Sequence, residues 1–120
     1  MATDQTLEVV REYHEAWSNG QFAQAANLLS ERLAVEVPIN DYPDAGSFAA
    51  ALASFGSIAR GVDLISELAT GDEAMLLYDM DVDSVGPMRV AEHFTVRGGK
   101  IVRIRQIHDT AALRAASVVA

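Results

Sequence analysis

The first part of the chain places apolar and polar residues at the spacing of an amphipathic helix. With residues 4–18 set at 100° intervals, apolar and small side chains gather on one side and charged side chains on the other. The buried side is expected to hold Thr6, Val9, Val10, Tyr13, Ala16 and Trp17. Asn19-Gly20 ends the helix, because glycine readily takes the conformation that follows a helix C-terminus. The pattern therefore predicts a helix over residues 4–18 with Tyr13 at the centre of its buried side.

Two further helices and one strand are expected before residue 61. A short helix is predicted by residues at the same spacing, namely Phe22, Ala25, Ala26 and Leu29. Residues 33–39 alternate in part and indicate a strand, and residues 40–44 indicate a loop by their composition and their proline. Ser47 can cap a third helix that runs to about Arg60. Its buried side is expected to hold Phe48, Leu52 and Phe55.

From Gly61 onward the pattern changes to that of strands. Strands are expected over residues 62–69, 73–85, 87–97 and 100–109, with turns at Gly71-Asp72, Gly86-Pro87 and Gly98-Gly99. The Ala-rich residues 110–120 are expected to form a short helix or to fray. Helices followed by a meander of strands favour an α+β fold over a parallel α/β sheet. We predict a single domain over residues 1–120, in which a curved antiparallel sheet wraps around three helices and leaves a cone-shaped pocket.

Alternation along the strands separates charged residues from pocket residues. The outer face is expected to carry Asp79, Asp81, Asp83, Arg89, His93, Arg97, Arg103 and Arg105. These side chains can form cross-strand ion pairs on a solvated face or at a dimer contact. The inner face retains the polar groups of Tyr78, Glu92, Gln106 and His108, which face Tyr13. Glu92 is the most informative of these, because an inward carboxyl is costly unless it is paired or protonated.

Composition and charge exclude several classes of function. The chain has 120 residues, no cysteine and a formal net charge of −8. The negative charge would repel nucleic acid and anionic membrane surfaces, and no apolar run is long enough to span a membrane. The N-terminal residues lack the features of a signal peptide, so a cytoplasmic location is the expectation. His14, His93 and His108 lie on different faces without suitably spaced carboxylates, so we expect no metal site and no cofactor.

Three segments resemble the superfamily of nuclear transport factor 2, and within it the ketosteroid isomerases and SnoaL-like polyketide cyclases. They are residues 9–20, with Tyr13 on the first helix, residues 72–74, and Glu92-His93-Phe94 followed by residues 99–101. In the isomerases, the matching tyrosine is a hydrogen-bond donor and the residue that matches Glu92 is a protonated aspartic acid. The resemblance therefore implies that Tyr13 and Glu92 both hold the oxygen of a ligand carbonyl as it becomes an enolate.

One position departs from the isomerase pattern. The isomerases place their general-base aspartate just before a proline on the first strand, and this chain has Val37 before Pro38. Valine cannot accept a proton, and the side chain of neighbouring Glu36 should face the other way. His108 is the expected replacement, because it faces the pocket and imidazole titrates near neutrality. Asp41 and Asp44, in the loop beside the pocket mouth, are weaker candidates.

Two functions are compatible with these residues. The first is an enzyme of the isomerase or cyclase type, in which Tyr13, Glu92 and His108 carry out acid/base proton transfer on a small apolar carbonyl compound. The second is a non-catalytic ligand-binding or dimerisation module of the same fold, which Val37 favours. Hydrolysis of an epoxide or ester by water that Glu92 or Asp41 activates is a further variant. The resemblance and the outer-face charges lead us to expect a homodimer.

The remaining pocket residues would bind the ligand. They are expected to be Trp17, Val37, Asn40, Tyr42, Phe55, Tyr78, Met80, Phe94 and Gln106. Each candidate also has a purely structural explanation. Tyr13 could be a core tyrosine, Glu92 could pair with Arg60, and His108 could be a hydrogen-bonded histidine at the rim.

Overall fold

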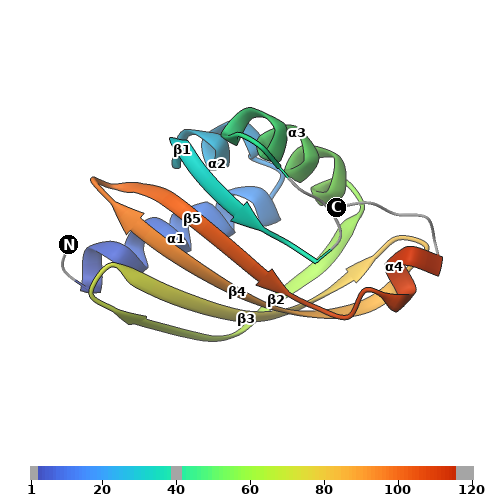
Figure 1. Ribbon diagram of the computed structural model, residues 1–120. Coiled ribbons are helices and arrows are strands. Elements are labelled where there is room, and N and C mark those ends of the chain that lie inside the picture. The colour runs from blue at the N-terminus through green and yellow to red at the C-terminus, as the bar shows by residue number, and fades with distance from the viewer. Residues whose placement is uncertain (1–2, 39–41, 116–120) are drawn as a thin grey trace.

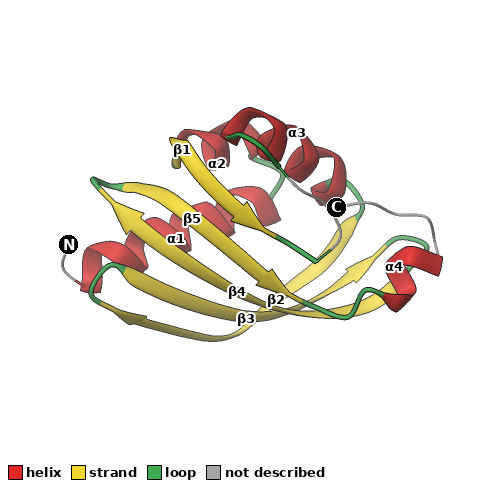
Figure 2. Cartoon of the chain, in the orientation of Figure 1, coloured by secondary structure: helices red, strands yellow, loops and turns green. Residues whose placement is uncertain are grey.

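A curved sheet wraps around helices in the computed structural model, which describes residues 3–38 and 42–115. The elements are α1 (Thr3–Ser18), α2 (Phe22–Asn27), β1 (Leu29–Glu36), α3 (Ala45–Gly56), β2 (Ala59–Thr70), β3 (Glu73–Val82), β4 (Gly86–Arg97), β5 (Lys100–Ile107) and α4 (Ala111–Ala115). Figures 1 and 2 show α1, α2 and α3 gathered on one side of the five-stranded sheet. The predicted α+β class is confirmed. None of the helices described is long and apolar enough to cross a membrane.

The sheet is mixed, which corrects one detail of the expected antiparallel arrangement. Its strand order is β1-β5-β4-β3-β2. Strands β2 to β5 form an antiparallel meander, whereas β1 pairs with β5 in parallel. The relative direction of these two strands depends on the path of the whole intervening chain, which no short-range pattern encodes. As a consequence, Val37 after β1 lies at the same end of the sheet as Gln106 and His108.

Several element boundaries differ from the expected ones. β1 begins at Leu29, and α3 ends at Gly56. Asp44, not Ser47, caps α3, and its Oδ1 accepts a hydrogen bond from the Ser47 backbone N–H at 2.7 Å. Asp44 has the extended backbone of an N-cap residue, while Ser47 already lies in the first turn. Arg60 lies in β2 and pairs with Asp83 at 3.3 Å, so it is not the partner of Glu92.

The buried side of α1 fixes the helix against the concave face of the sheet. Val10 and Tyr13 of α1 are fully buried, as are Phe94 of β4 and Ile104 of β5. The rings of Tyr13 and Phe94 meet edge to face, with centroids 5.8 Å apart. Each buried side chain of this size contributes about 1.5–3 kcal/mol to folding. This packing sets the position of Tyr13 relative to the polar residues of β4.

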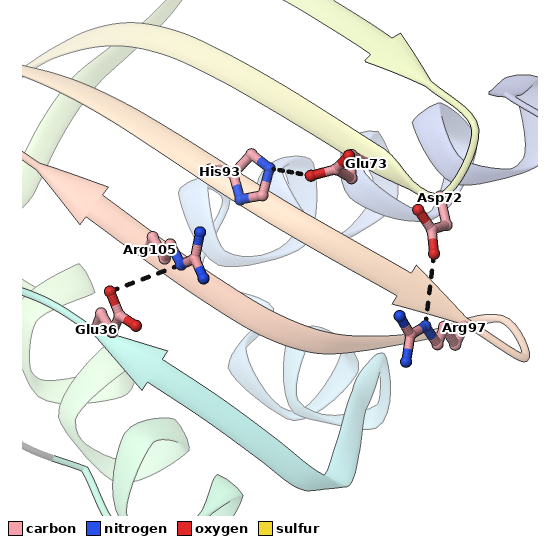
Figure 3. A network of polar contacts seen from close by, with 6 residues as sticks. All are labelled: Glu36, Asp72, Glu73, His93, Arg97 and Arg105. Atoms are coloured by element: carbon pink, nitrogen blue, oxygen red, sulfur yellow. Dashed lines mark hydrogen bonds and ion pairs between the residues drawn. The ribbon is translucent and has the colours of Figure 1, made fainter.

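The outer face of the sheet carries the expected cross-strand ion pairs. Figure 3 shows three of them, in which His93 contacts Glu73, Arg97 contacts Asp72 and Arg105 contacts Glu36. A further pair joins Arg89 and Asp79, with Nε and Oδ1 2.8 Å apart. Apart from His93, the side chains in these pairs are more than a third exposed, and exposed pairs of this kind add little to stability. The prediction that alternation along the strands separates outer charged residues from inner polar residues is confirmed for these residues.

Candidate functional site

A cavity lies between α1, α3 and the concave face of the sheet. It encloses about 40 Å³ of free space, and the wider hollow that includes its open mouth is about 520 Å³. The lining residues are Tyr13, Trp17, Val37, Tyr42, Phe48, Ala51, Leu52, Phe55, Tyr78, Met80, Met88, Val90, Glu92, Gln106 and His108. Most of this wall is hydrocarbon or aromatic, so the few polar atoms would determine how a ligand is oriented.

Glu92 is the buried polar centre of the cavity, with 1% of its surface exposed. Tyr78 donates its hydroxyl to Oε1 at 3.0 Å, and Gln106 donates its Nε2–H to Oε2 at 2.8 Å. Gln106 is directly opposite Glu92 in the β4–β5 ladder, and Tyr78 reaches it diagonally from β3. Burial raises the pKa of Glu92 to about 7, although the hydrogen bonds from Gln106 and Tyr78 oppose that rise. The carboxyl is therefore poised to exchange a proton near neutral pH.

Tyr13 contributes a hydroxyl that is completely buried at the cavity. This oxygen has no hydrogen-bond partner among the residues that the structure describes. Burial, and then the negative charge of Glu92, raise the pKa of Tyr13 well above its ordinary value. The hydroxyl thus stays protonated and can donate to a ligand oxygen. An unpartnered buried hydroxyl is costly, and a ligand would remove that cost.

His108 lies at the rim of the same cavity, just after β5, and is half-buried. Its Nδ1 is 3.1 Å from the carbonyl oxygen of Asp109. Because a carbonyl oxygen can only accept, this contact assigns the proton to Nδ1 and leaves Nε2 as the acceptor of the neutral ring. His108 can therefore accept a proton at the mouth of the cavity.

The structure brings most of the predicted site residues together. Trp17, Val37, Tyr42, Phe55, Tyr78, Met80 and Gln106 line the cavity with Tyr13, Glu92 and His108. Phe94 does not line it and instead packs beneath Tyr13 in the core. Asn40 and Asp41 lie outside the described residues.

Other lining residues were not among the predicted site residues. These are Phe48, Ala51, Leu52, Met88 and Val90. The sequence does place them on the right faces. Met88 and Val90 alternate with Glu92 on the same side of β4, and Ala51 and Leu52 follow Phe48 at helical spacing. Their side chains carry no polar group, so the sequence marks them as apolar without distinguishing core from cavity wall.

His14 is a buried residue that the helical pattern missed. It is 5% exposed, although it was not among the residues expected on the buried side of the first helix. Its ring centroid lies 4.8 Å from that of Tyr78 and 5.4 Å from that of Trp17. Burial lowers the pKa of His14 to about 4, with a smaller opposing effect from Glu67. The ring is therefore neutral at pH 7.

The described residues of this site provide no set of side chains that could bind a metal ion. Among residues 3–38 and 42–115, no three His, Asp or Glu side chains are grouped so that they could hold a metal ion. The chemistry that these residues can support is proton transfer and hydrogen bonding.

Comparison with known families gives a match over most of the chain. Residues 10–104 match the family model described as the SnoaL-like domain. The comparison with curated proteins found no match.

Solved structures give the same fold. A protein from Kribbella flavida is 28% identical with a TM-score of 0.87, and the match covers 92% of each chain. A ketosteroid isomerase-like protein from the same organism is 18% identical with a TM-score of 0.75, over 91% of this chain and 81% of that one. An epoxide hydrolase from M. tuberculosis is 17% identical with a TM-score of 0.77, over 95% of this chain and 90% of that one. Other matched structures with the same fold are named NTF2-like proteins.

Proposed function

Because the chain belongs to the SnoaL-like domain family, within the NTF2-like superfamily, we propose that it is an enzyme of the ketosteroid isomerase or polyketide cyclase type. Its substrate would be a small apolar compound with one carbonyl group. The reaction would be acid/base transfer of a proton on a carbon next to that carbonyl.

The observation that carries the proposal is the pairing of Glu92 with Tyr13 at one cavity. Glu92 accepts hydrogen bonds at both carboxyl oxygens, at 3.0 and 2.8 Å, an arrangement that suits the ionised form. Tyr13 presents a protonated hydroxyl without a partner among the described residues. One group can take a proton and the other can hold the oxygen that becomes negative, which are the two requirements of enolisation.

The step follows from these roles. The carboxylate of Glu92 takes the proton as the C–H bond breaks, and the electron pair moves onto the carbonyl oxygen. Tyr13 donates its hydroxyl to the resulting enolate oxygen. Return of the proton from Glu92 to the same or a different carbon completes the reaction. His108, at the rim, would exchange protons with solvent.

This assignment gives Glu92 a different role from the one that the family resemblance implies. Both carboxyl oxygens of Glu92 already accept hydrogen bonds, from Tyr78 and Gln106, and this favours the ionised form over a protonated acid that donates to a ligand. A base at Glu92 would also compensate for Val37, which occupies the usual base position. We therefore propose that Glu92 is the base and Tyr13 the oxyanion donor.

Cavity size limits the substrate. A water molecule needs at least about 10–15 Å³ of such space, so 40 Å³ admits only a few non-hydrogen atoms. The carbonyl end of a ligand would enter this space, and its apolar remainder would occupy the wider hollow under Leu52 and Phe55 of α3. A substrate with several fused rings would require α3 or the Tyr42 loop to shift.

Substituted phenols test the proposal, because a phenolate oxygen resembles an enolate oxygen. We expect phenols to bind in the cavity and Tyr13→Phe to weaken the binding about tenfold or more, the loss of one hydrogen bond to a charged oxygen. Direct titration of the Glu92 carboxyl by ¹³C NMR should give a pKa near 7. A Glu92 that titrates near 4.5, or phenol binding that is unaffected by Tyr13→Phe, would contradict the proposed chemistry.

A non-catalytic ligand-binding module is the second candidate, and Val37 is the observation that favours it. The two candidates differ in one measurable property. An enzyme of the proposed type should catalyse exchange of deuterium from D₂O into the carbon next to the carbonyl of a bound ketone, and Glu92→Gln should abolish that exchange. A binding module should bind the same ketone without exchange.

A further inference from the structure

His14 packs against Tyr78, which donates a hydrogen bond to the proposed acid/base group, although His14 does not line the cavity. Three aromatic rings pack against one another there, with centroid separations of 4.8 Å for His14–Tyr78, 5.4 Å for His14–Trp17 and 5.8 Å for Trp17–Tyr78. Trp17 and Tyr78 line the cavity, whereas His14 does not. His14 is only 5% exposed.

The orientation of Tyr78 matters because its hydroxyl is one of the two donors to Glu92. The bond to Oε1 is 3.0 Å long, and a small rotation of the Tyr78 ring about its own side-chain bonds would lengthen or break it. The ring of Tyr78 is held between its neighbours on α1, and His14 is the nearer of the two rings. Aromatic pairs at such separations restrict each other's orientation and contribute beyond simple burial.

The ring of His14, more than its nitrogen, makes this contact. Its Nδ1 is buried and has no hydrogen-bond partner within the described part of the chain. Glu67 of β2, which affects His14 through its charge, is itself bonded to Arg11, whose Nε lies 2.9 Å from both carboxylate oxygens. A phenylalanine in place of His14 should therefore keep the stacking and lose no bond to Nδ1.

We propose that His14 is a positioning residue. Its ring holds the Tyr78 hydroxyl on Glu92, and this hydrogen bond keeps the carboxyl from binding its proton more tightly. The inference deepens the proposed function and rests on it, because it concerns the same acid/base group.

The test is a double-mutant cycle read by ¹³C NMR titration of Glu92 in the full chain. His14→Ala and Tyr78→Phe should each raise the pKa of Glu92 by about one unit, because each removes a hydrogen bond that stabilises the ionised form. The double variant should show the same rise as Tyr78→Phe alone, because both changes act through one bond. His14→Phe should restore the wild-type value to within a few tenths of a unit.

Val10→Ala is the matched control. It truncates another buried residue of α1, one that has no ring to pack against Tyr78. It should lower the stability of the fold and leave the pKa of Glu92 unchanged. If His14→Ala does not fold, His14→Leu removes the flat ring with less loss of volume and carries the same expectation. An unchanged Glu92 pKa in folded His14→Ala or His14→Leu, or additive shifts in the cycle, would overturn the role of His14. A wild-type Glu92 that titrates near 4.5 would instead contradict the proposed function itself.

Discussion

At the scale of single residues, one buried carboxyl links the stability of the fold to the proposed chemistry. Burial raises the pKa of Glu92 from the ordinary value of 4.5 to about 7. The folded state therefore holds a proton that the unfolded chain has already released between these two pH values. The contribution of Glu92 to stability is complete below about pH 4.5 and is lost as the pH rises through 7. A group tuned for proton transfer thus costs stability at the pH where it would work.

Glu92→Gln tests this linkage. Its free energy of unfolding should fall less with pH than that of the wild type, by about 2 kcal/mol between pH 5.5 and 8.5, because glutamine does not ionise. Urea unfolding at several pH values measures the difference. The depressed pKa of His14 has the opposite pH dependence, but it is present in both proteins and cancels. A wild-type minus variant difference that does not change with pH would contradict the raised pKa of Glu92.

At the scale of elements, the sequence predicted which face of each strand is buried better than it predicted where elements begin and end or which strands pair. Alternation placed Tyr78, Glu92 and Gln106 on the concave face. A strand has only two sides, and the apolar residues at every second position indicate which side is buried. The parallel pairing of β1 with β5 could not be predicted, because it depends on contacts between segments about seventy residues apart. His14 was missed for a related reason. Its burial comes from the curvature of β2 and β3 around α1, which widens the buried side of the helix beyond its apolar residues.

The packing of α3 against α2 gives a prediction at this scale. A Cβ on Gly56, the last residue of α3, would lie 2.5 Å from Cε1 and 2.8 Å from Cζ of the Phe22 ring in α2. Gly56→Ala should therefore destabilise the fold by about 1 kcal/mol, because the clash outweighs the small gain in helix propensity. The clash depends on the ring, so Gly56→Ala should be neutral or stabilising when Phe22 is replaced by Leu. Urea unfolding of the two single variants and the double variant measures this coupling. Strictly additive effects would show that the Phe22 ring does not set the position of α3.

At the scale of the whole molecule, the outer face of the sheet has the composition of an interface. Leu68 is 70% exposed and Ile107 71% exposed, while Met75, directly opposite Leu68, is 43% exposed. Ala91 is directly opposite Ile107, and Leu77 is opposite Ala91 on the next strand, so that all five residues form an outer apolar patch. Ion pairs of both signs border the patch, such as His93–Glu73 and Arg89–Asp79. An apolar centre within a mixed-charge rim is the usual anatomy of a protein interface.

We propose that a second copy of the chain covers this outer apolar patch. A surface with acidic and basic groups around one apolar centre can meet its own copy after a two-fold rotation, so that unlike charges face each other. The pairing would leave the concave face free, and each subunit would keep a complete cavity of its own. Dimer formation would therefore stabilise the sheet without changing the roles proposed for Tyr13 and Glu92.

Light scattering during gel filtration tests the dimer. The wild type should elute with about twice the 12.9 kDa mass of one chain. A charge at the centre of the patch, Leu68→Glu or Ile107→Glu, should shift the protein to the monomer, because an unpaired carboxylate buried at an interface is strongly unfavourable. Ala50→Glu places the same charge on an exposed position of α3 and should leave the mass unchanged.

A wild type that is monomeric at micromolar concentration, or patch variants that remain dimeric, would rule out this face as the dimer interface. Because each cavity lies wholly within one chain, phenol binding should survive in the monomeric variants, which separates assembly from the chemistry of the site.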